Sequence, residues 1–148
     1  MKWARPTPRH VYYVANNLRM EDRREVWFSH RVLAEEAVVR SWAESRICMA
    51  VETDEGWPCA VTGVVGDRIW LLATPELTGT RRRRSQMCRE GREWVQHCLK
   101  EVGTTLRNDV HAKNTASVQW LKWLGFTVEP PRPVGVSCEL FHHFWRSP

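Results

Sequence analysis

The chain has 148 residues, a length that fits one domain with its own hydrophobic core. Lys and Arg outnumber Asp and Glu by 22 to 17, a mild excess that favours phosphate-bearing or acidic partners. No apolar segment approaches the roughly 20 residues of a membrane span, and the N-terminus lacks a signal-peptide run. The five cysteines show no C-x-x-C spacing. We therefore expect a protein made in a cytoplasm, with free thiols and neither a metal site nor a membrane span.

The N-terminal third has the apolar spacing of helices. Residues 10–19 and 33–45 each place apolar side chains on one helical face. The charged turn between them offers Asp22 as a helix cap. Short runs rich in Val and Ala then predict a meander of three strands, at residues 46–53, 58–66 and 68–74.

A long helix is expected at residues 80–102, because its apolar side chains share one face and Gly103 can end it. Gly91 on that face favours close packing. A strand near 104–111, a shorter helix capped by Asn114, and two final strands complete the order. This order predicts one α/β (α+β) domain over residues 1–148, with a mixed sheet.

The segment "NDVHAKNTASVQWLKWLGFTV" resembles the last conserved segment of the GNAT acetyltransferase superfamily. The matching positions are Asn114, Ser117, Gly125 and Phe126, and the strand order upstream also agrees. The resemblance implies a mixed, mostly antiparallel central sheet flanked by helices. It also implies acetyl-CoA as the cofactor of any catalysis.

Two features depart from the superfamily pattern. Leu121 stands where a Tyr usually protonates the thiolate of coenzyme A, a general-acid role that Leu cannot fill. The stretch "PELTGTRRRRSQ" keeps Gly79 but replaces later glycines of a pyrophosphate-binding loop with arginines. Arginine side chains can bind phosphate by paired hydrogen bonds. The alternative is a solvated surface with no ligand.

No catalytic residue can be assigned from the sequence. His111 could replace the missing acid, although a lone histidine near a strand end is more often structural. Ser85 and Cys88 lack a His-Asp arrangement that would make either one a nucleophile.

A second resemblance spans nearly the whole chain. The blocks "RIWLLATPEL" and "LRNDVHAKNTASVQWLKWLGF" are similar to those of internal virion or morphogenesis proteins of short-tailed (podovirus-type) phages. Ala73 replaces the usual Gly of that pattern, and His111 replaces the usual Asp. The matching positions are Trp70, Leu71, Leu72, Thr74, Asn108, Val110, Ala112, Asn114, Trp120, Leu121, Trp123, Leu124, Gly125 and Phe126.

The phage resemblance implies a virion-associated or morphogenesis protein that has a GNAT-like fold, no catalysis and no cofactor. Its expected partners are other phage structural proteins, a second copy of the chain, or DNA phosphate bound through Arg81–Arg84. We expect it in the host cytoplasm during synthesis, with its presence in the virion left open. Trp70, Trp94, Trp120, Trp123 and Trp145 could form a contact surface for a partner or cover the sheet edge.

The alternative is an acetyl-CoA-dependent N-acetyltransferase. The GNAT resemblance then implies that Ala73 and Thr74 hold the pantetheine arm and that Asn114 contacts the cofactor. The pyrophosphate would be held by Thr80, Arg81, Arg82, Arg83 and Arg84. A third hypothesis, a small nucleic-acid-binding module, rests on the arginines alone and predicts strongly salt-dependent binding.

Overall fold

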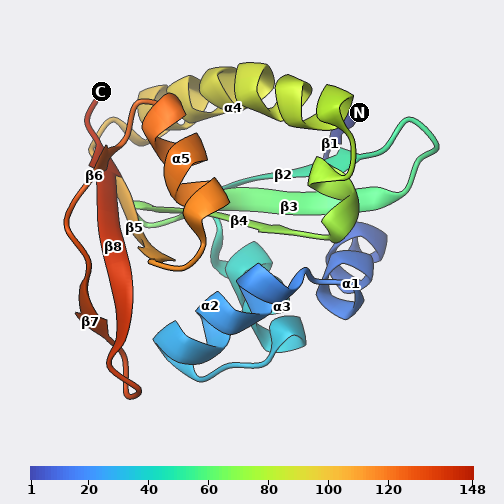
Figure 1. Cartoon of the computed structure of the whole chain (residues 1–148). Helices are drawn as coiled ribbons and strands as arrows, with labels where there is room; N and C mark the ends of the chain where they lie inside the picture. The colour runs from blue at the N-terminus through green and yellow to red at the C-terminus, as the bar shows by residue number, and fades with distance from the viewer.

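The computed structural model describes all residues, 1–148, and contains eight strands and five α-helices (Figure 1). The strands are β1 (Lys2–Ala4), β2 (Ile47–Glu52), β3 (Pro58–Val65), β4 (Arg68–Ala73), β5 (Leu106–His111), β6 (Thr127–Val128), β7 (Arg132–Val134) and β8 (Glu139–Arg146). The helices are α1 (Pro8–Asn16), α2 (Met20–His30), α3 (Ala34–Glu44), α4 (Arg81–Val102) and α5 (Thr115–Trp123), with a 3-10 turn η1 (Pro75–Thr78) before α4.

The strands form one sheet in the order β1-β2-β3-β4-β5-β8-β6, with β7 also paired to β8. Every pair is antiparallel except β4 and β5, which run parallel. This mixed, mostly antiparallel sheet with flanking helices confirms the predicted fold class. No helix combines the length and apolarity needed to cross a lipid bilayer.

Helices cover both faces of the sheet (Figure 1). On one face α4 and α5 pack against β4, β5 and β8 through a core that includes Val95, Leu99 and Leu121. On the other face α1 and α3 pack against Val61 and Leu72. Gly91 lets α4 approach α5, because a Cβ there would lie 3.0 Å from Trp120 Cζ2.

Helix α2 differs from the prediction. Residues 20–30 form a full helix, and Asp22 lies inside it rather than capping it. The N-cap position is Arg19, which makes no side-chain capping bond. The prediction that Asp22 caps this helix was therefore wrong. Its carboxylate instead bonds the end of β4.

A gap opens in the centre of the sheet between β4 and β5. Arg68 and Arg107 are the only paired residues of these two strands. One step further, Asn108 Nδ2 donates to the Ile69 carbonyl at 2.8 Å. The N–H of Asp109 then bonds Asn108 Oδ1 instead of β4. The two strands therefore separate toward their carboxyl ends, and this separation positions the site described next.

Candidate active site

Helix α2 holds the carboxyl end of β4 at the wide end of the gap. Asp22 Oδ2 accepts a hydrogen bond of 2.9 Å from the N–H of Ala73, and the Arg19 N–H donates to the Ala73 carbonyl at 2.9 Å. Arg19 Nε also donates to Asp22 Oδ2 at 2.8 Å. Asp22 is only 2% exposed, so this carboxylate works as a buried, paired anchor.

Glu25, one helical turn later, holds the β5 side of the same gap. Its Oε1 accepts a hydrogen bond of 3.1 Å from the N–H of His111 and another of 2.9 Å from Asn114 Nδ2. Residues three apart on a helix share a face. Asp22 and Glu25 therefore bridge the ends of two strands that no longer pair with each other.

Burial, together with the nearby Asp22 carboxylate, raises the pKa of Glu25 to about 7. The hydrogen bonds from Asn114 and His111 oppose this shift. Burial also raises the pKa of Asp22, against the opposing effect of Arg19. Glu25 can therefore gain or lose a proton near neutral pH.

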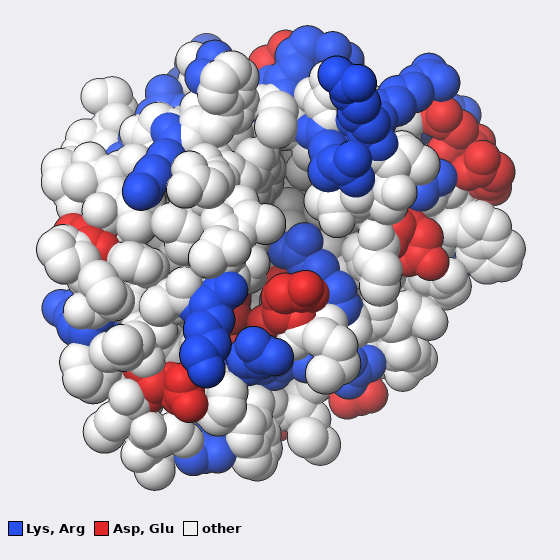
Figure 2. Space-filling model, in the orientation of Figure 1, with Lys and Arg blue, Asp and Glu red and all other residues white.

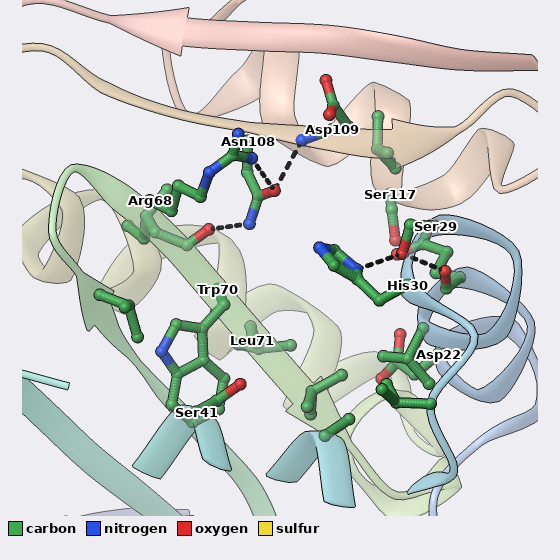
Figure 3. Close-up of a pocket in the computed structure, with 18 of the residues that line it drawn as sticks. Asp22, Ser29, His30, Ser41, Arg68, Trp70, Leu71, Asn108, Asp109 and Ser117 are labelled. Atoms are coloured by element: carbon green, nitrogen blue, oxygen red, sulfur yellow. Dashed lines mark hydrogen bonds between the residues drawn. The ribbon is translucent and has the colours of Figure 1, made fainter. Parts of the chain in front are cut away.

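Two cavities meet at the gap. The first, of about 410 Å³, lies between α2, α3 and the strands β4 and β5, where Figure 3 shows Asp22, Leu71 and Asn108 among its lining residues. The second, of about 890 Å³, lies between η1, the start of α4 and α5. Four residues line both cavities: Arg19, Leu71, Ser117 and Trp120. The gap therefore connects one face of the sheet with the other.

Two polar groups at this junction can bind a ligand. Ile69 and Ala73 direct backbone groups toward the β5 side, because they bond Asn108 and Asp22. Alternate residues of a strand point the same way, so Leu71 between them presents its N–H and C=O to the gap. Trp120 Nε1 is the one buried side-chain N or O atom with no hydrogen-bond partner. An unpaired buried donor of this kind needs an explanation, and a ligand carbonyl would supply one.

No family model and no curated protein matches the chain. Solved structures do match over nearly its whole length. A spermidine N-acetyltransferase from Vibrio cholerae, in complex with CoA and spermine, superposes with a TM-score of 0.66 at 10% identity, covering 98% of this chain and 94% of that one. A ribosomal-protein-alanine N-acetyltransferase from Brucella melitensis superposes with a TM-score of 0.70 at 14% sequence identity, and the match covers 100% of both chains. The ribosomal-protein-S18-alanine N-acetyltransferase from Escherichia coli superposes with a TM-score of 0.62 at 18% sequence identity. This match covers 97% of this chain and 90% of that one.

The fold is that of the GNAT acetyltransferases. At these identities the likeness concerns the fold alone. None of these matches supports the predicted relation to phage virion proteins. The parallel β4–β5 pair with its gap is the part of this GNAT fold that brings the two cavities together.

The residues predicted for the pyrophosphate gather at the start of α4. Thr80 caps the helix, since its Oγ1 accepts from the Arg83 N–H at 3.2 Å. The N–H groups of Arg81 and Arg82 precede the first helical hydrogen bond and have no partner. The Arg83 and Arg84 guanidinium groups donate to the carbonyls of Glu76 and Thr78 at 3.0 and 2.8 Å.

Arg84 lines the second cavity, and Figure 2 shows Lys and Arg side chains gathered over the α4 N-terminus beside a hollow of the surface. Gly79 has a right-handed helical conformation with φ of −67°. An ordinary residue adopts this conformation, so the chain reaches α4 without the special backbone that glycine-rich loops use.

Ala73 and Thr74 were expected to hold the pantetheine arm, but their amides already have partners. The Ala73 N–H bonds Asp22, and the Thr74 N–H donates to the Cys59 carbonyl at 2.9 Å. Their role stays a prediction that would require these bonds to open. Leu71, between Ile69 and Ala73, is instead the β4 residue whose backbone faces the gap without a bond to Asn108 or Asp22.

Asn114 lines the second cavity and is nearly buried. Its Oδ1 accepts from the Ser117 N–H at 3.4 Å, which caps α5 as predicted, while its Nδ2 bonds Glu25. The predicted contact with a cofactor stays untested. Sequence reasoning placed Asn114 correctly but did not connect it with α2.

His111 is structural. Its Nδ1 accepts from the Lys113 N–H at 3.1 Å, so Nε2 carries the hydrogen that faces Glu139 Oε2 at 3.1 Å. The ring is 2% exposed and stacks on Phe28. Both ring nitrogens are occupied, which favours the structural interpretation over the general acid.

Glu25 was missed because its segment was interpreted as a charged turn. The available signal was the pair of carboxylates three residues apart in "MEDRREVW", a segment with no continuous apolar face. Without an apolar stripe, such a helix packs through polar side chains that face inward, here Asp22 and Glu25 with their hydrogen bonds to the strands.

The five tryptophans do not form one contact surface. Trp70 donates from Nε1 to Ser45 and packs with the α1 and α3 core, whereas Trp94 donates to Thr62 and packs with the α4 core. These two rings therefore lie on opposite faces of the sheet. Of the set, Trp123 and Trp145 are exposed.

Proposed function

We propose that the chain is a coenzyme A-dependent N-acyltransferase. In this proposal an acyl thioester such as acetyl-CoA binds in the second cavity, and an amine acceptor enters through the first. The observation that carries the proposal is the meeting of the two cavities at the β4–β5 gap. The solved structures with the same fold include acetyltransferases for a polyamine and for a ribosomal protein, which supports the reaction class.

The second cavity fits the groups of coenzyme A. Its phosphates need positive charge and free N–H groups, and the helix α4 N-terminus offers the amides of Arg81 and Arg82 beside the Arg84 side chain. Its amide-containing arm needs hydrogen-bond donors within an apolar channel. Trp120 Nε1 and the Leu71 backbone supply polar groups at the junction.

When bound, the thioester supplies an activated acyl group. The chain's own part is to hold the phosphates with Arg84, to orient the arm with Trp120, and to exclude water with the apolar walls of the gap. These contributions are positional, and positioning alone supplies a large share of many rate enhancements.

The missing tyrosine does not forbid the reaction. Leu121 is 8% exposed, lines the first cavity and has no proton to give. A thiol has an ordinary pKa near 8.5, so a thiolate leaves at neutral pH without an acid beside it. The absence of a general acid typically slows such a step by about 10²–10⁴-fold.

The first cavity favours an acceptor that carries positive charge. Five carboxylate residues line it, against three arginines. Asp22 is paired with Arg19, and Glu36 with Arg40 at 3.3 Å. Asp109 bonds His143, which leaves Glu25 and Glu44 without an ion-pair partner. Ammonium groups match this surplus of negative charge.

Release of free thiol from acetyl-CoA tests the proposed function. The purified chain is mixed with acetyl-CoA and either a polyamine or a peptide with an N-terminal alanine, and the thiol is followed with a chromogenic disulfide. Acceptor-dependent release together with an acetylated product by mass spectrometry supports the proposal. No release above the acceptor-free rate with either class of amine contradicts it.

The phage assembly role and its partners remain a prediction from the sequence resemblance. Its distinguishing feature is the exposed arginine run at the start of α4, which acidic protein surfaces or DNA phosphate would also match. The same thiol-release assay and a salt series of DNA binding separate this role from acyl transfer.

A further inference from the structure

We propose that Glu25 is the general base of this acyl transfer, and that its carboxylate takes a proton from the ammonium group of the acceptor inside the first cavity. The inference depends on the proposed N-acyltransferase function and names a catalytic residue for it.

The first support is position. Glu25 lines the first cavity, beside the gap where that cavity meets the second. Leu71 and Trp120, which line both cavities, mark where the acyl group would lie. An amine that reaches the junction from the α2 side therefore passes Glu25.

The second support is the way the carboxylate is held. The His111 N–H and Asn114 Nδ2 both donate to Oε1, so that oxygen is fixed from two directions. Oε2 is left to exchange a proton. Because Oε1 can accept both bonds in either protonation state, the side chain keeps its place when the proton arrives.

The third support is the contrast with the other acidic groups of the cavity. Asp22 is bonded to Arg19 and Ala73 through its Oδ2. Asp109 bonds His143 at 2.9 Å, and Glu36 bonds Arg40. Glu44 is the last residue of α3 and makes no hydrogen bond to either side of the gap. Glu25 alone combines a carboxylate that forms no ion pair with hydrogen bonds to the β5 side of the gap.

The proposed reaction moves one proton to Glu25 and the acyl group to the amine. The N–H bond of the ammonium group breaks and an O–H bond forms on Glu25 Oε2. The freed lone pair of the amine forms the new C–N bond to the acyl carbon of the acyl-CoA co-substrate, and the C–S bond breaks. The second amine proton ends on the released thiol, and Glu25 returns its proton to water through the first cavity.

The charges around Glu25 set the pH at which the base works. From α2 and its start it faces Asp22 and Arg19, and from β5 and the start of α5 it faces the His111 N–H and Asn114. The His111 ring is bonded to Glu139 instead. With the pKa of Glu25 raised to about 7 by burial, the ionised base accumulates as pH rises through that value.

The test compares Glu25→Gln with a matched control, Glu35→Gln, which removes an exposed carboxylate of α3 outside both cavities. Gln keeps the shape and an oxygen for both hydrogen bonds but cannot take the proton. We expect thiol release by E25Q to fall about 10²–10⁴-fold, with coenzyme A affinity by calorimetry within twofold of the parent. E35Q should match the parent in both measurements.

A second readout does not depend on turnover. Carbon-13 NMR of the Glu side-chain carboxyls should show one resonance titrating near pH 7 in the parent and in E35Q, and none there in E25Q. Glu25→Asp, which keeps a carboxylate on a shorter stem, should recover part of the lost rate. Equal losses in the Asp and Gln variants would assign Glu25 a purely structural role.

The outcomes separate the two proposals. An active parent and an equally active E25Q overturn the role of Glu25 and leave the acyltransferase standing. A parent that neither binds coenzyme A nor releases thiol overturns both. An E25Q that is slow, binds coenzyme A normally and lacks the titrating resonance supports both.

Discussion

Asn114 Nδ2 donates a 2.9 Å hydrogen bond to Oε1 of Glu25, a residue 89 positions earlier in the chain. Because Asn114 also caps α5, this bond joins the start of α5 to the centre of α2 across the mouth of the gap. A change at Asn114 should therefore alter the proton affinity of Glu25.

Asn114→Asp tests this coupling. The new carboxylate would place a second negative charge against Glu25 and remove the Nδ2 donor, and both changes raise the pKa of Glu25. We expect the acidic limb of the rate–pH profile to move upward by about one unit or more. Asn17→Asp, at the exposed end of α1, is the control and should leave the limb in place. An unmoved limb in N114D would show that Glu25 does not govern it.

The pH dependence of folding stability tests the raised pKa of Glu25 independently of turnover. The pKa of Glu25 rises from 4.5 to about 7 on folding, so between these values the folded state binds more protons than the unfolded state. Stability therefore falls as pH rises through this window, and the full penalty is present above it.

Glu25→Gln removes that penalty. We compare the free energy of unfolding of E25Q with that of the parent at two pH values. The difference should favour E25Q by roughly 1–3 kcal/mol more at pH 8 than at pH 5. Urea unfolding at both pH values measures the change, and taking the difference between variants cancels other titrating groups. A difference in free energy of unfolding between parent and variant that does not change with pH would contradict the raised pKa of Glu25.

Arg84 should bind phosphate and Arg89 should not. Arg84 lines the second cavity, whereas Arg89 lies further along α4, outside it, with its guanidinium mostly exposed. Arg84→Ala removes a charge-assisted hydrogen bond, so we expect coenzyme A affinity to fall about tenfold. Arg89→Ala should change it less than twofold. Equal effects of the two substitutions would indicate a general attraction without a defined phosphate site.

Gly91→Ala should affect binding more than stability. The added Cβ would lie 3.0 Å from Trp120 Cζ2 and 3.2 Å from Leu124 Cδ2, so the Trp120 ring has to shift toward the cavities it lines. The gain in helix propensity, about 1 kcal/mol, offsets much of the overpacking. We expect a melting change of a few degrees and a clear loss of coenzyme A affinity, with exposed Gln96→Ala as the control. Unchanged affinity would place Trp120 outside the binding site.

Periodic apolar patterns predicted the elements that pack through apolar stripes. The α5 face of Val118, Leu121 and Leu124 is buried as expected, and α4 begins and ends within a residue of the prediction. Helix α2 could not be predicted in this way, because bonds from Asp22 and Glu25 hold it rather than an apolar stripe. Strands β1 and β7 have three residues each, too few for an alternating pattern.

The candidate site shows the same contrast between features that local sequence predicts and features that depend on the folded sheet. Thr80 and the arginines could be placed at the start of α4 because a helix start can be located from local sequence, and α4 begins at Arg81. Their phosphate-binding role stays a prediction. Glu25 could not be assigned, because its partners His111 and Asn114 reach it only through the separation of β4 and β5. That separation is a property of the folded sheet, which no local pattern encodes.

Calorimetric titration of the purified chain with coenzyme A tests the central claim most directly, since both proposals require that molecule in the second cavity. We predict micromolar affinity that falls in the Arg84→Ala variant. No heat of binding at millimolar coenzyme A would contradict the acyltransferase and leave the GNAT fold with another use.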